Sequence, residues 1–156
     1  GMYLSKRTDN NQFSYRITPF NFNPVFAGLM TQKQVDNLVK RYYFSPEYFY
    51  GEWMIPSIAR NDPAYEDQEY VRGRIWPMFK FFVYKGLKQY HEDAAAKDLA
   101  EKSHKLLMKT WLTESAIYEN FNAITGEGND KGTSDSFYHW GALLGYIYML
   151  EEGALK

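Results

Sequence analysis

Glu119 is the residue whose surroundings in the sequence point most clearly to chemistry. It lies in the run YENFNAITGEG (residues 118–128), where tyrosine, asparagine and phenylalanine precede two closely spaced glycines. Aromatic faces can stack on sugar rings, amides can bind hydroxyls, and a carboxylate can polarise a water molecule. This combination suits a carbohydrate site with a catalytic carboxylate. The alternative is that Glu119 is a solvated side chain in front of a glycine-containing loop.

The aromatic content is the unusual feature of the composition. Aromatic residues make up 19% of the chain, with 14 Tyr, 11 Phe and 4 Trp. Such rings can form sugar-stacking surfaces, and Tyr and Trp add a polar group to them. The composition is equally compatible with a core that is simply rich in aromatic side chains.

The remaining composition narrows the class of protein. A chain of 156 residues with 45% hydrophobic and 24% charged residues is typical of one globular domain. The net charge of −1 gives no reason to expect nucleic acid or an anionic membrane as a partner, and no apolar run is long enough for a membrane helix. With no cysteine and three scattered histidines, we expect no metal site and no cofactor. Gly1 before Met2 is typical of a residue left by tag cleavage, and the sequence indicates no cellular compartment.

The first half of the chain combines one helix with long loops. Residues 1–30 contain strand-like and loop signals, including two prolines and several asparagines. Thr31 and Gln34 form a capping-box pattern that predicts a helix reaching about residue 42, and residues 45–47 (SPE) predict a short helical turn. Residues 51–74 then form a long connection whose aromatic content favours an ordered loop.

The second half predicts three helices, over residues 75–90, 92–113 and 135–150. The first has apolar residues at helical spacing on one face, and the second has an apolar side that includes Trp111 opposite a lysine-rich face. The third follows Thr133-Ser134-Asp135, which are good capping residues, and is apolar nearly all round, so we expect it to be buried on most sides.

These elements predict an all-α fold with long loops. Polar-faced helices alternate with buried ones, and the loops that contain candidate site residues lead into the buried helices. This order favours a partial (α/α) toroid with alternating outer and inner helices, formed by residues 1–156 as a single domain. A four-helix bundle is the competing architecture, but its helices should be more evenly amphipathic and its loops shorter.

Four motifs in fixed order resemble the C-terminal part of the (α/α)6-toroid glycosidases of glycoside hydrolase family 63. This group includes processing α-glucosidases and mannosylglycerate hydrolases, and trehalases are more distant relatives. The resemblance extends from about residue 12 to residue 151. The motifs are IPSIARNDPAY (55–65) leading into YVRGRIWP (70–77), then ENFN (119–122) with TGEG (125–128), and finally FYHWG (137–141).

The resemblance implies roles for several residues. In that family the Arg-Gly-x-x-Trp motif lines the substrate pocket, which corresponds to Arg72, Gly73 and Trp76. The carboxylate of the Glu-Asn-Tyr-Asn motif is the base of an inverting hydrolysis, which corresponds to Glu119.

Two positions depart from the family pattern. Val71 stands where the family usually has Trp before the arginine, so one stacking surface is lost. Phe121 replaces the usual Tyr, which removes a hydroxyl and keeps the ring.

Three further residues are candidates for sugar binding. Asn120 offers an amide to sugar hydroxyls, Trp140 offers a stacking platform, and Glu127 between two glycines could touch substrate or orient its loop. Each has an alternative: tryptophans at helical spacing are often core residues, Glu127 could lie in a solvated turn, and Arg72 could form a structural ion pair.

Inverting hydrolysis also needs an acid, with its carboxyl about 6.5–9.5 Å from that of the base. In the family this acid is an Asp upstream of the segment that the chain resembles, and no motif here matches it. The sequence is therefore interpreted as the last third or so of a catalytic domain.

Two functions follow from this interpretation. One is part of an inverting glycosidase for α-linked glucosyl or related sugars, with Glu119 as base. The other is a non-catalytic helical module that binds sugar or another molecule. For either, we expect apolar helix faces to drive formation of a homo-oligomer, or pairing with the missing part of the catalytic domain.

Overall fold

The computed structural model describes residues 2–155, and in this range all regular elements are helical. The main helices are α1 (Asn23–Phe26), α2 (Gln32–Leu38), α3 (Pro77–Gln89), α4 (Asp93–Glu114) and α5 (Leu143–Glu151). Strand-like pairing is limited to isolated bridges. The prediction of an all-α fold with long loops is confirmed.

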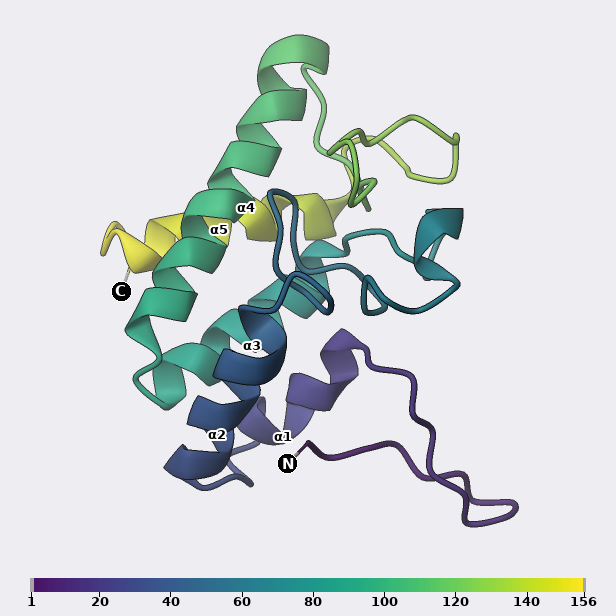
Figure 1. The fold of residues 1–156 in the computed structure, drawn as a ribbon. Coiled ribbons are helices and arrows are strands. Elements are labelled where there is room, and N and C mark those ends of the chain that lie inside the picture. Colours follow the sequence, from purple (N-terminus) through teal and green to yellow (C-terminus); the bar gives the residue numbers. More distant parts are fainter. Residues whose placement is uncertain (1, 156) are drawn as a thin grey trace.

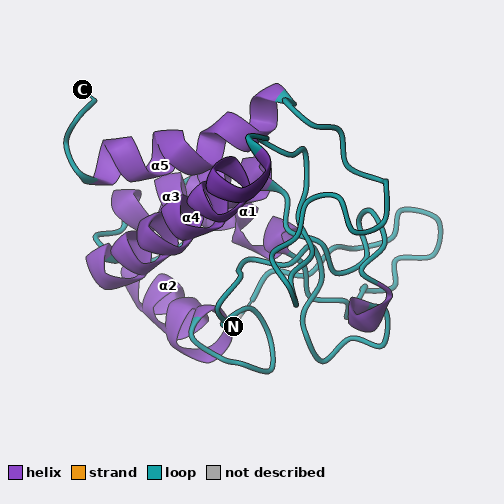
Figure 2. Cartoon of the chain, turned by 90° about the horizontal axis from the view of Figure 1, so that it is seen from above, coloured by secondary structure: helices purple, strands orange, loops and turns teal. Residues whose placement is uncertain are grey.

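α3 lies at the centre of the helical layer and contacts α1, α4 and α5. Figure 2 shows the helices gathered on one side of the molecule and the long loops on the other. No helix within residues 2–155 is long and apolar enough to cross a membrane.

Local signals in the sequence explain where the helices begin and end. At α2, the Thr31 amide donates to Gln34 Oε1 over 2.8 Å, and the Gln34 amide returns to Thr31 Oγ1. This capping box confirms the predicted start, and a π-helical turn (Val39–Tyr43) continues the helix. α3 starts with Pro77 in its first turn, where no intrahelical donor is lost.

The molecule has two hydrophobic cores. One lies among the helices and includes Leu38, Leu87 and Leu99. The other lies under the loops and joins Trp53, Ile75, Phe121 and other residues of the loops to Leu106 of α4 and Leu144 of α5. The long connection at 51–74 is ordered, as expected, because it contributes buried side chains to both cores.

Four predictions about the elements are wrong, and the fourth is the start of the last helix. Residues 45–47 form a turn rather than a helix. Trp111 is 45% exposed rather than on the packed side of α4, since the C-terminal turns of α4 extend beyond α5 (Figure 1). α5 is not buried on most sides, because Tyr146 and Met149 are each more than 40% exposed.

The last helix begins at Leu143, after a 3-10 turn (His139–Ala142), and not at residue 135. Residues 134 and 135 cap no helix, because they bind the backbone of residues 119 and 120 instead. Phe137 has a φ of 60°, which a right-handed helix does not allow.

Candidate functional site

Glu119 lies in an extended segment that is held between two others. On one side, Ile75 and Phe121 exchange backbone hydrogen bonds of 2.7 and 3.0 Å. On the other side, the Glu119 amide donates to the Asp135 carbonyl over 2.9 Å. The Ser134 hydroxyl contacts both the amide and the carbonyl of Asn120, at 2.9 and 2.8 Å. The backbone of the candidate base is therefore anchored on both sides.

The Glu119 carboxyl is nearly buried, with 8% of the residue exposed. Burial raises its pKa, the nearby Asp135 carboxylate raises it further, and a hydrogen bond from the Asn120 side chain opposes both effects. That bond joins Asn120 Nδ2 to Glu119 Oε2 over 3.3 Å. A carboxyl whose pKa is raised toward the working pH is better suited to take a proton from water.

Arg74, which was not among the residues predicted for the site, is a buried charge that contacts Asn120, the neighbour of Glu119 in the sequence. Its side chain is fully buried, and its Nε donates to Asn120 Oδ1. Its Nη1 forms an ion pair of 2.9 Å with Asp130, and its Nη2 donates to the Gly128 carbonyl over 3.3 Å. These contacts connect the segment at residue 74 with the loop that follows Glu119.

Asp130 is the counter-ion of this arginine. Burial alone would raise the pKa of Asp130, but hydrogen bonds from Asn122 and Arg74 and the arginine charge hold it below its ordinary value. The bond from Asn122 Nδ2 measures 2.7 Å. The signal in the sequence was a second arginine in the Arg-Gly-Arg motif, but its partners lie about 50 residues away.

Trp76 and Trp140 stand next to each other, with ring centroids 6.0 Å apart. Trp76 is buried, and its indole nitrogen donates to the Tyr70 carbonyl over 2.9 Å. Trp140 is half-buried and has the Tyr138 ring against it. Of the two tryptophans, Trp140 is thus the more accessible for stacking on a sugar, and Trp76 supports it from behind.

The other predicted binding residues lie in different surroundings. Arg72 is exposed and forms an ion pair of 2.8 Å with Asp67, which corresponds to the structural alternative for this residue. Gly73 has a φ of 100°, and a Cβ there would collide with the Tyr65 carbonyl and the Gln68 side chain, so glycine is required for this turn. Glu127 is exposed in a turn and accepts a hydrogen bond from Thr125.

The structure therefore brings some predicted residues together and leaves others apart. Asn120 contacts Glu119 directly, and Trp76 belongs to the segment that pairs with residue 121. Arg72 and Glu127 are held by Asp67 and Thr125. Within residues 2–155 no group of three His, Asp or Glu side chains is placed to hold a metal ion.

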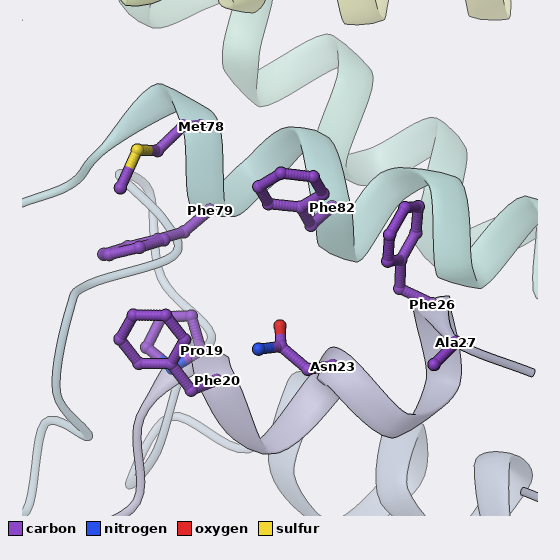
Figure 3. A pocket seen from close by; sticks show the side chains of 8 residues that line it. All are labelled: Pro19, Phe20, Asn23, Phe26, Ala27, Met78, Phe79 and Phe82. Atoms are coloured by element: carbon purple, nitrogen blue, oxygen red, sulfur yellow. The ribbon is translucent and has the colours of Figure 1, made fainter. Parts of the chain in front are cut away.

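A separate apolar groove of about 310 Å³ lies between α1 and the start of α3 (Figure 3). Phe20 stacks edge-on against Phe79 at 4.9 Å, and Phe26 lies 5.1 Å from Phe82. Asn23 is its single polar lining residue. The full lining is Pro19, Phe20, Asn23, Phe26, Ala27, Met78, Phe79 and Phe82. The groove adjoins the tryptophan pair through Phe79, whose ring lies 6.5 Å from that of Trp76.

Comparison with known proteins identifies related sequences. The family model described as "Mannosylglycerate hydrolase MGH1-like glycoside hydrolase domain" matches residues 1–140. Mannosylglycerate hydrolases MGH1 and MGH2 of Selaginella moellendorffii are each 27% identical to the chain over 138 residues. The match covers 85% of this chain and 26% of each relative, so the chain spans about a quarter of their length.

Solved structures show the same fold. The GH63 mannosylglycerate hydrolase from Thermus thermophilus in complex with glucose matches with a TM-score of 0.79 at 22% identity, over 95% of this chain and 35% of that chain. The same enzyme has also been crystallised with Tris and D-glycerate. Neutral trehalase Nth1 from Saccharomyces cerevisiae matches with a TM-score of 0.72 at 14% identity, over 96% and 26% of the two chains. The chain thus has the structure of a portion of the GH63 (α/α)6 toroid.

Proposed function

Because this chain belongs to the mannosylglycerate hydrolase MGH1-like glycoside hydrolase family, we propose that it provides the general base of an inverting glycosidase. The substrates are α-linked glucosyl or related sugars, and Glu119 is the base. The observation that supports this role most directly is the buried Glu119 carboxyl with its raised pKa.

In the proposed reaction, Glu119 takes a proton from a water molecule as that water attacks the anomeric carbon. A second carboxyl group protonates the leaving oxygen on the other side of the sugar, about 6.5–9.5 Å from the base. We place this acid outside the present chain, in the part of the catalytic domain that the longer relatives contain.

The sugar-binding roles follow from the accessibility of the candidate residues. Trp140 stacks on the ring of the substrate, supported by Trp76. Asn120 is fully buried and donates to Glu119, so its role is to hold the base rather than to contact the sugar. Arg72 and Glu127 are exposed and belong to the outer rim of the pocket, where Arg72 would have to leave Asp67 to contact a sugar. Gly73 is buried and shapes the turn behind them.

The alternative function is a non-catalytic helical module that binds sugar or another molecule without hydrolysing it. One observation favours it: none of the motifs in the chain supplies the general acid that inverting hydrolysis needs. Binding would then use the accessible face of Trp140, while Glu119 would be only a hydrogen-bond acceptor.

Turnover and binding assays distinguish the two functions. The purified chain is assayed on aryl α-glucosides and natural α-disaccharides, with Glu119→Gln as the matched variant, and sugar binding is measured by calorimetry. Turnover that Glu119→Gln abolishes supports the hydrolase. Saturable binding without turnover of the aryl α-glucosides, whose leaving group needs little protonation, supports the module. Turnover that survives in Glu119→Gln would exclude Glu119 as the base.

A further inference from the structure

The Arg74 guanidinium is a fully buried cation whose contacts all lie in the loop region around Glu119. Its Nε binds the Asn120 side chain, and its Nη1 binds Asp130 and faces the Gln68 carbonyl at 3.4 Å. Its Nη2 binds the Gly128 carbonyl. A buried charge is tolerated only when it is paired and hydrogen-bonded, and this arginine meets both conditions.

These contacts determine which way the Asn120 amide points. A guanidinium has donors and no acceptor, so only the amide oxygen of Asn120 can face Arg74 Nε. The amide nitrogen must then point away from Arg74, and it donates to Glu119 Oε2 over 3.3 Å and to the Thr133 carbonyl over 3.2 Å. If the amide were turned over, Asn120 would present an acceptor to Glu119 and would favour its protonated form.

We propose that Arg74 is a positioning residue for Glu119, because through Asn120 it keeps an N–H donor directed at the carboxylate that serves as the base. This inference rests on the proposed function for the purpose of the contact, but the contact itself is a property of the chain. We call the chain of contacts from Arg74 through Asn120 to Glu119 the relay.

The relay acts through orientation rather than through the charge of the arginine. Asp130 pairs with Arg74 at 2.9 Å and so offsets its charge locally. Burial and the Asp135 carboxylate raise the pKa of Glu119, whereas the Asn120 hydrogen bond lowers it. The relay therefore limits how far burial can push the base toward its protonated form.

The relay can be tested by measuring the pKa of Glu119 directly, by carboxyl-carbon NMR titration of the full chain labelled on glutamate. Arg74→Met combined with Asp130→Asn removes one positive and one negative charge, so the net charge is unchanged. We expect this double variant to raise the pKa of Glu119 by about one unit, which is the usual effect of losing one hydrogen bond to a charged group.

A second variant tests the intermediate link. Asn120→Ala removes the donor to Glu119 and leaves the Arg74–Asp130 pair in place, so it should raise the pKa by a similar amount. Because both changes break the same relay, combining them should produce no further rise. The matched control is Arg16→Met with Asp62→Asn, which removes an ion pair in which Arg16 is exposed and should leave the pKa unchanged.

An unchanged pKa in Asn120→Ala would overturn the relay even if the Arg74 variant did not fold. Additive rises would also overturn it, since they would show that Arg74 acts by charge and not through Asn120. The titration needs no turnover. An inactive chain that shows the expected shifts would therefore leave the relay intact and favour the non-catalytic module, whereas an active chain without the shifts would overturn the relay and keep the hydrolase.

Discussion

Replacing Lys80 by methionine should stabilise the protein. Lys80 lies in α3, is fully buried, and its Nζ has no hydrogen-bond partner among the residues that the structure describes. Burial lowers the pKa of Lys80 to about 7, repulsion by Lys102 contributes to the shift, and Asp98 opposes it. The length of the lysine side chain thus suits its position in the core, whereas its charge destabilises the folded state.

The sign and size of the effect follow from the two pKa values. In the unfolded chain the lysine has its ordinary pKa of 10.5, so between pH 7 and 10.5 the unfolded state binds more protons than the folded state. The free energy of unfolding therefore rises with pH across this window and is lowest at pH 7 and below. A gap of 3.5 between the pKa values, at about 1.4 kcal/mol per unit, corresponds to a penalty of about 5 kcal/mol at low pH.

Lys80→Met keeps a long unbranched side chain and removes the charge, so it should recover most of this penalty. Urea unfolding followed by circular dichroism at pH 6, 7, 8 and 9 measures the difference between the variant and the original protein. We expect a gain of several kcal/mol at pH 6 that shrinks steadily toward pH 9. The control is Lys85→Met, an exposed lysine on the same helix, which should change stability little at any of these pH values.

Two outcomes would refute this reasoning. If Lys80→Met were less stable than the original protein at pH 6, the ammonium group would have a stabilising partner that its buried position does not suggest. If the gain were the same at every pH, the lysine would not titrate in the window from 7 to 10.5, and the stabilisation would come from packing alone.

Three further predictions concern the site, the groove and a close contact. Glu119→Gln should abolish any turnover and also raise the urea midpoint at pH 7. Because the pKa of Glu119 is raised in the folded state, ionisation of this carboxyl favours the unfolded chain at pH values above about 4.5. The stability that Glu119→Gln adds at pH 7 should therefore disappear at pH 4. The exposed apolar groove predicts that the protein forms a homodimer at micromolar concentration, which light scattering can measure. The double variant Phe26→Ser with Phe82→Ser should be monomeric. A monomeric original protein would contradict the prediction. Gly128→Ala should lower stability by about 1–3 kcal/mol in thermal unfolding, because its Cβ would collide with the Tyr118 ring; an unchanged melting temperature would show that the loop can adjust.

The helices were predictable where their signals are local. The capping box at Thr31 and the apolar spacing within residues 77–89 and 93–114 depend on residues within one or two turns of each other. Such patterns determine the type and most of the length of a helix without knowledge of the rest of the fold.

The start of the last helix was not predictable by the same means. Ser134 and Asp135 have the residue types of a helix cap, but in the structure they bind the backbone at residues 119 and 120. A side chain that can cap a helix can equally well pair with a distant segment, and the sequence does not show which partner is present.

The candidate site was predicted only in part, because some of its contacts join residues that are distant in the sequence. Glu119 and Asn120 are adjacent in the sequence, so their association was evident from the motif. Arg74 binds Asn120, which lies 46 residues further along the chain, and a buried arginine cannot be distinguished from an exposed one by its neighbours in the sequence. Arg72 and Arg74 stand two residues apart, yet one is exposed and the other fully buried.

The aromatic residues of the chain divide between buried rings and rings with accessible faces. Many rings contact one another in the cores, as Phe22 does with Phe49 at 5.7 Å, and these fill space. Trp140 and three phenylalanines of the groove, Phe20, Phe26 and Phe82, keep accessible faces. Composition therefore could not decide between buried and accessible rings, because both occur.

The loops around Glu119 keep their geometry without a regular sheet, and this bears on what the chain can do alone. Polar side chains take the place of ladder hydrogen bonds: Ser134 binds both backbone groups of Asn120, and Gln68 Oε1 accepts from the Ala123 amide over 2.7 Å. Their hydrophobic support, the second core, also lies within the chain. The burial of Glu119 and its hydrogen-bond donor are thus set by the chain itself, so the surroundings of the proposed base do not depend on the acid that the proposed mechanism places elsewhere.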